Sequence, residues 1–194
     1  HDGVFSKNKP SNRSFKNLDL SSRINQLNDP NIGDFELTLY SKTSMGDGSQ
    51  ANNPWLQEMP DPITRVSWDN YLTISATTAK ELGLSNWNVS NGALNGSLVD
   101  ITSDEVTLKN IPVMISPGQA RSTVGMAIGY GRTKAGKAGD NVGFNAYPFL
   151  SAKTVSISKV EGEYEFACIQ LHHTMMGRDI VKETTLSEYI KDPS

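Results

Sequence analysis

The feature that most constrains the fold is a succession of short strand-like stretches separated by turn residues. In residues 34–41, Phe35, Leu37 and Leu39 alternate with polar side chains, which predicts a half-buried strand. The stretches 154–160 and 164–171, joined by residues 161–163, are expected to form a hairpin. Six or seven short strands predict a mainly β, closed or nearly closed barrel with a few helices. The further stretches are 63–74, 93–102, 105–109, 111–115, 154–160 and 164–171.

Residues 53–70 form the most unusual segment, because they hold two tryptophans and three prolines. Asn53 followed by Pro54 predicts the cap and first residue of a short helix, which the next proline ends. Trp55 and Trp68 are expected to be buried, since large aromatic side chains favour burial. The segment is therefore interpreted as a pinned connection over a core or against a partner.

Two further helices carry end signals. Ser75 is the predicted cap of a helix over residues 76–82, which Gly83 ends. Near the C-terminus, Thr185 and Glu188 have the spacing of a capping box, which predicts a short helical turn.

Composition excludes several classes of function. The net charge of -3 gives no electrostatic reason to expect nucleic-acid binding. No run of about 18 apolar residues predicts a membrane-spanning helix. The single cysteine, Cys168, excludes an internal disulfide or a cysteine-ligated cluster, and its apolar surroundings predict a buried, unreactive thiol. Because the chain starts at His1 without a signal peptide, we expect a processed form or a piece of a longer protein.

A glycine-rich loop is the first candidate for chemistry. Residues 131–138 nearly match the phosphate-binding pattern G-x4-G-K-[ST], but Ala138 stands where the metal-binding hydroxyl is needed. A flexible basic loop is expected there, and a cradle of backbone amides near a nucleotide phosphate stays open.

Metal and acid–base chemistry find little support. His172 and His173 are adjacent, so in a strand their side chains point to opposite faces and do not share a metal. Asp61 and Asp69 could form a carboxylate pair, but Asp61 lies between two prolines and is expected to order a turn. The residues alone therefore predict a barrel-like domain without an active site of its own.

Several segments together resemble the C-terminal dinucleotide-binding domain of the molybdopterin oxidoreductase superfamily. The resemblance covers residues 34–175 and implies a six-stranded double-psi β-barrel. One departure is that residues 85–92 replace the Gly-Asp-x-Val that usually follows the Leu-Gly step. The matching segments are 35–40, 53–62, 68–75, 79–83, 117–118, 129–131 and 141–146.

Residues 172–178 and 183–189 narrow the resemblance to the iron–sulfur subunit of alternative complex III. The polar composition of residues 1–33, with only scattered apolar residues, predicts a linker or wrapping arm. The resemblance implies the barrel over 34–175 and a connector over 176–194 towards an iron–sulfur domain. It implies a structural domain of a quinol-oxidising respiratory complex on the periplasmic side of the bacterial inner membrane. The expected partners are other domains and subunits of that complex, with no nucleic acid and no direct membrane insertion.

The family pattern also places a cofactor, should one bind. Backbone amides and asparagine side chains suit a guanine edge and a pyrophosphate. The alternative function is therefore a molybdopterin guanine dinucleotide-binding lid of an active molybdenum or tungsten oxidoreductase. The leading expectation is that these residues only make turns and that the domain holds no cofactor, metal or catalytic residue. The candidate positions are Tyr40, Ser41, Lys42, Gly129, Gly131, Asn141 and Asn145.

Overall fold

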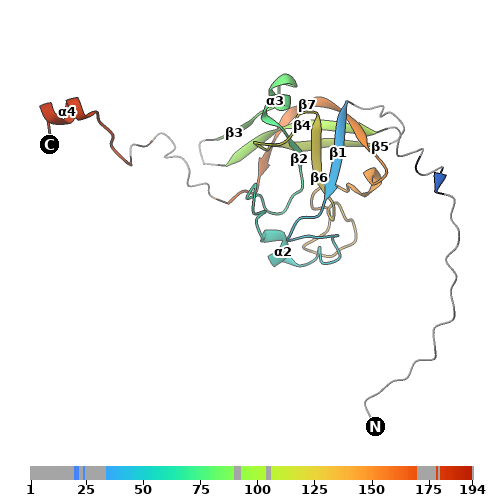
Figure 1. The fold of residues 1–194 in the computed structure, drawn as a ribbon. Helices are drawn as coiled ribbons and strands as arrows, with labels where there is room; N and C mark the ends of the chain where they lie inside the picture. The colour runs from blue at the N-terminus through green and yellow to red at the C-terminus, as the bar shows by residue number, and fades with distance from the viewer. Residues whose placement is uncertain are drawn as a thin grey trace, which may run out of the picture. The chain divides into compact units, whose positions relative to one another are not determined.

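The computed structural model describes residues 20, 21, 24, 34–89, 93–103, 106–169, 178 and 180–193. The chain divides into two units, 1–31 and 32–194. Most of the expected arm over 1–33 lies outside the described residues. The described part of the second unit is mainly β, with short helices (Figure 1). None of the described helices has both the length and the apolar character needed to cross a membrane.

Seven strands make one sheet, in the order β3-β4-β5-β2-β6-β1-β7, and β4 pairs with β7 in addition. The β1–β6 and β2–β5 pairs are parallel and all other pairs are antiparallel. The strands are β1 (Phe35–Tyr40), β2 (Leu72–Ile74), β3 (Asn86–Asn88), β4 (Leu94–Ser103), β5 (Val106–Ile115), β6 (Thr123–Ala127) and β7 (Thr154–Phe166). The helices are α2 (Pro54–Glu58), α3 (Ala76–Glu81), η1 (Tyr147–Phe149) and α4 (Leu186–Lys191).

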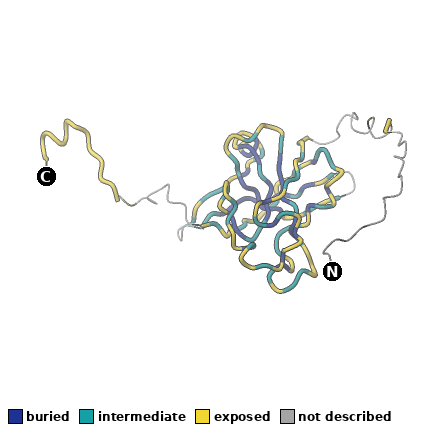
Figure 2. Tube along the Cα trace, turned by 60° about the horizontal axis from the view of Figure 1, so that its bottom comes forward, coloured by how far each residue is buried: buried dark blue, intermediate teal, exposed yellow. Residues whose placement is uncertain are grey.

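Strand β1 confirms the alternation read from the sequence, with Phe35, Leu37 and Leu39 half-buried between exposed Glu36 and Thr38. Its inner face packs on a core made by the central strands. Figure 2 colours the buried residues of the trace dark blue, and they run through the interior of the described part of the second unit. Fully buried members include Leu72, Ile74, Val99, Ile101, Ile111, Val113, Val124, Met126 and Val155.

The predicted hairpin over 154–171 is wrong, because β7 is one continuous strand that pairs along β4. Residues 161–162 are not a turn but a bulge: Glu163 pairs with Ser97, and Val160 already pairs with Leu98. Gly162 takes the positive φ of 116° that this bulge requires.

Two other strand predictions need correction. The expected stretches 105–109 and 111–115 are one strand, β5, which passes through Asn110 at a φ of 57°. The carboxylate of Asp100 on β4 accepts a hydrogen bond from the Asn110 N–H at 2.8 Å and fixes this irregularity. The strand expected over 63–74 shrinks to β2, because Asp61 turns the preceding chain.

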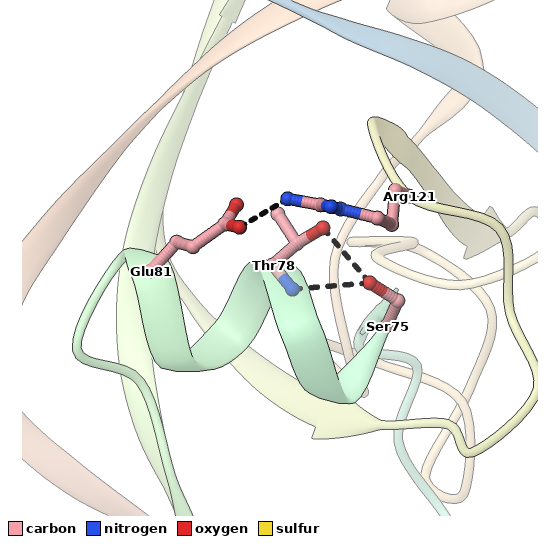
Figure 3. A network of polar contacts seen from close by, with 4 residues as sticks. All are labelled: Ser75, Thr78, Glu81 and Arg121. Carbon is pink, nitrogen blue, oxygen red and sulfur yellow. Dashed lines mark hydrogen bonds and ion pairs between the residues drawn. The ribbon is translucent and has the colours of Figure 1, made fainter.

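The helix end signals are confirmed. Asn53 caps α2, and Thr185 and Glu188 form the capping box of α4. At the start of α3, Ser75 Oγ accepts the Thr78 N–H at 3.1 Å and donates to Thr78 Oγ1 at 2.8 Å (Figure 3). Glu81 of the same helix pairs with Arg121, so α3 is held to the turn that precedes β6.

Candidate functional site

The parallel pair β1–β6 brings two groups of predicted site residues together. Tyr40 is opposite Ala127, so both strands end at the same edge of the sheet. The Ile128 N–H donates to the Tyr40 carbonyl at 2.9 Å just past the end of β6. The segments beginning at Ser41 and at Gly129, on which the resemblance places the candidate cofactor residues, therefore leave the sheet side by side.

The glycines at this edge are in contact with the chain's own backbone. A Cβ added to Gly129 would lie 2.9 Å from both the Gly46 carbonyl oxygen and the Gly48 nitrogen. A Cβ on Gly131 would lie 2.2 Å from the Asn145 nitrogen. Glycine is needed at both positions, because two loops of this chain meet there and leave no room for a Cβ.

The two predicted asparagines lie in turns. Asn141 is exposed, has a φ of 60°, and donates its N–H to the Arg132 carbonyl at 2.6 Å. Asn145 is also exposed, and its Oδ1 accepts the Tyr147 N–H at 3.1 Å. These contacts agree with the turn-making interpretation of both residues.

Sequence reasoning missed Asn70, which is fully buried. Its Nδ2 donates to the Ala127 carbonyl at 2.7 Å and to the Phe144 carbonyl at 2.9 Å, and its Oδ1 accepts the Phe144 N–H at 2.7 Å. One side chain thus joins the start of β2, the end of β6 and the loop that follows β6. The sequence signal for Asn70 is its place at the end of the unusual segment 53–70, directly after Trp68 and Asp69.

Lys42, a predicted cofactor ligand, points into the protein and is 4% exposed. Its Nζ donates to the Asp69 carbonyl at 2.8 Å and lies 4.0 Å from the centroid of the Tyr71 ring and 5.5 Å from that of Tyr130. Burial lowers the pKa of Lys42 to about 8, although the charges of Asp61 and Asp69 act in the opposite direction.

The tyrosines around this lysine are kept neutral. Burial raises the pKa of Tyr40 to about 12 and that of Tyr130 to about 12, and it raises the pKa of Tyr71 as well. Across the same cluster, the Tyr164 hydroxyl donates to Asp69 Oδ2 at 2.5 Å. Neutral phenols, a half-buried carboxyl group and a buried ammonium therefore make one connected polar cluster.

The two candidate carboxylates have different roles. Asp61 orders the turn as predicted, since its Oδ1 accepts the N–H groups of Ile63 at 3.0 Å and Thr64 at 2.8 Å. Asp69 is half-buried, and burial raises its pKa against the opposing effects of the Tyr164 hydroxyl and Lys42. Both carboxylates are therefore held in place by neighbouring groups.

The loop that resembles a phosphate-binding pattern uses its amides internally. Asp140 Oδ1 accepts the N–H groups of Ala135 and Gly136, and Asn52 Oδ1 accepts the Ala138 N–H at 3.1 Å. A carboxylate of this chain thus takes the place that a phosphate would need. Beside the loop lies an open depression of about 600 Å³, lined by residues 48–54, Arg132, Lys134 and Ala135.

Trp55 is the clearest departure from expectation. The prediction that it is buried is wrong: the side chain is 82% exposed, whereas Trp68 is half-buried. The buried position of the five-residue helix α2 is Gln57, whose Nε2 donates to the Ala51 carbonyl at 2.9 Å. This anchor turns Trp55 outward. Met59 at 41% and Ile63 at 82% are exposed on the same segment.

Cys168 is half-buried, and burial raises the pKa of its thiol, which suits the predicted unreactive role. The described part of the chain holds no group of three His, Cys, Asp or Glu side chains arranged for a metal ion. The predictions for His172 and His173 lie outside the described residues.

In comparisons with known proteins, no family model matches this chain and no curated protein matches it.

Proposed function

We propose that this chain is a structural domain of a molybdopterin-oxidoreductase-like iron–sulfur subunit, part of a quinol-oxidising respiratory complex on the periplasmic side of the bacterial inner membrane. In this proposal the domain carries no redox centre of its own and binds other domains and subunits. Membership of that complex rests on the sequence resemblance. The observation that carries the docking role is a set of exposed large apolar side chains on one segment, namely Trp55, Met59 and Ile63, here called the docking surface.

The strand pairings support the fold that the proposal requires. Because β7 pairs with both β1 and β4, the pairings run in a ring, β1-β7-β4-β5-β2-β6, with β3 added to β4. The ring is symmetric: it stays the same when β1 is exchanged with β5, β2 with β6, and β4 with β7. The same exchange turns the parallel pair β1–β6 into the parallel pair β5–β2. Two interlocked, equivalent halves favour a six-stranded double-psi barrel.

The docking surface is preorganised. Trp68 N–H donates to the Gln57 carbonyl at 2.8 Å, and Ser67 Oγ donates to the Glu58 carbonyl at 2.9 Å, so α2 is tied to the strand-like segment behind it. Rigid, exposed aromatic and aliphatic side chains are typical of the central contacts of protein interfaces. Little conformational entropy is lost when such a segment binds.

The alternative function, a lid over a molybdopterin guanine dinucleotide, has one observation in its favour. The open depression of about 600 Å³ beside Gly131 is lined by Arg132 and Lys134, which could face phosphates. The contacts at Gly129 and Gly131 favour the structural role, because this chain's own loops fill the space next to them.

Replacing Trp55 by alanine tests the structural role. Because the side chain is exposed, Trp55→Ala should change the stability of the isolated chain by less than about 0.5 kcal/mol. In the complete subunit it should weaken assembly about 30-fold or more, as for a central interface residue. Leu150→Ala, which removes another exposed apolar side chain, is the matched control. Normal assembly of Trp55→Ala would contradict the proposal, as would a loss of stability in the isolated chain.

A further inference from the structure

Residues 53–68, here called the docking segment, carry the docking surface. The segment 69–71, here called the corner, connects the docking segment to β2 and contacts the buried ammonium group of Lys42. We propose that Lys42 is a positioning residue that uses its charge to fix the corner, and through it the docking surface, at the expense of the stability of the fold. The inference rests on the proposed function only for the role of that surface. The chain alone is sufficient to test the positioning itself.

The geometry makes Lys42 a contact between three separate segments. Its backbone follows β1, its Nζ bonds the Asp69 carbonyl of the corner, and its ammonium lies over the rings of Tyr71 and Tyr130, the second of which follows β6. A cation over aromatic faces with one hydrogen bond to a carbonyl is a directional arrangement. A neutral apolar side chain of the same length would fill the space without fixing the corner's carbonyl.

The corner continues directly into the docking segment. The two residues before Asp69 each donate a hydrogen bond to this segment. The Trp68 N–H donates to the Gln57 carbonyl, and Ser67 Oγ donates to the Glu58 carbonyl. Both acceptors belong to α2, which carries Trp55. The path from the Lys42 ammonium to the exposed indole therefore consists of a short run of chain and two hydrogen bonds.

The position is unfavourable for a charge. Among the described residues, no carboxylate oxygen forms an ion pair with Lys42 Nζ. A buried ammonium without such a partner destabilises the folded state relative to a neutral group. A residue that lowers stability where an apolar one would fit is expected to serve another purpose, and placement of the corner is the purpose that these contacts support.

The sign of the pH dependence follows from the lowered pKa. Between about pH 8 and the ordinary value of 10.5, the unfolded chain keeps a proton that folded Lys42 releases, so this group makes stability rise with pH in that window. The phenols act oppositely, because their raised pKa values make stability fall as pH rises above about 10. The groups facing Lys42 are Asp61, Asp69 and Tyr71, which precede β2, and Tyr130 after β6. Tyr40 of β1 acts on Tyr71 in the same cluster.

The test compares the full chain with Lys42→Met, which keeps the length of the side chain and removes the charge. The ratio of the unfolding constants of wild type and variant should fall about 200-fold between pH 7 and pH 11, as the lysine loses its proton. Taking this ratio removes the contribution of the phenols. At pH 7 the variant should be no less stable than wild type, yet the Trp68 amide should exchange with solvent about tenfold faster or more, while the amides of β4 and β5 keep their rates.

Lys137→Met removes an exposed lysine and should change neither quantity. A ratio that does not vary with pH would overturn the inference, as would an unchanged Trp68 exchange rate at pH 7. The positioning role and the docking role are tested by different variants. If Lys42→Met gives the expected results but Trp55→Ala assembles normally, Lys42 positions the corner and the proposed docking function is wrong.

Discussion

Replacing Asn70 gives the sharpest test of how the loops at the strand ends are held. Its fully buried amide makes three hydrogen bonds to backbone groups of Ala127 and Phe144. Asn70→Ala leaves two carbonyls and one N–H without this partner. An unpaired buried polar group costs about 1–3 kcal/mol, so the three together should lower the free energy of unfolding by about 3–5 kcal/mol after local relaxation.

Urea denaturation at pH 7, followed by tryptophan fluorescence, measures this loss. Asn70→Asp should be at least as destabilising as Asn70→Ala at that pH, because a carboxylate oxygen would then face the two carbonyls that the amide now bonds. As pH falls and the new carboxyl takes up a proton, the deficit of Asn70→Asp should shrink.

Asn88→Ala, the same change at an exposed position of β3, is the control and should cost less than about 0.5 kcal/mol. A loss below about 1 kcal/mol for Asn70→Ala would refute the reasoning, because it would mean that the three bonds do not hold these loops together.

Two further predictions concern the same region. Gly48→Ala should destabilise the chain by about 3 kcal/mol or more, because its Cβ would lie 2.2 Å from the Gly129 carbonyl oxygen. Gly46→Ala is the control: it is also at positive φ but has nothing within 4 Å, so it should lower the free energy of unfolding by only about 1–2 kcal/mol. Equal losses in denaturation would argue against the contact between the two loops. Asp69 has a raised pKa, so above pH 3.8 the folded state holds a proton that the unfolded state releases. Wild-type stability should therefore fall relative to that of Asp69→Asn as pH rises from 3.8. Thermal melts of both proteins from pH 3 to 7 measure this difference, and a trend of the opposite sign would contradict the burial argument.

Local signals in the sequence were sufficient for some elements. The alternation in β1 and the caps Asn53, Ser75 and Thr185 were read correctly, because each depends on residues a few positions apart. The hairpin was misread because Gly162 suits a turn and a bulge equally. Only the long partner strand β4, far away in the sequence, decides for the bulge.

The candidate site was predicted in part for the same reason. The resemblance placed the candidate residues on the segments that follow residues 35–40 and precede residues 141–146, and the parallel pairing of β1 and β6 brings Tyr40 and the segment of Gly129 to one edge of the sheet. It could not show that Lys42 points inward or that loops of the chain pack against Gly129, because both depend on long-range packing. Trp55 was placed inside on size alone, whereas the anchor at Gln57 turns it outward.

The central claim, that this domain serves as structure rather than as a cofactor lid, is tested most directly by analysing the complete parent subunit purified from its native host. Molybdenum, tungsten and releasable pterin dinucleotide should be measured together with assembly and quinol oxidation. The account predicts an assembled, active complex with neither metal nor pterin in stoichiometric amount. A stoichiometric pterin guanine dinucleotide would contradict it and would make the depression beside Arg132 and Lys134 a cofactor site.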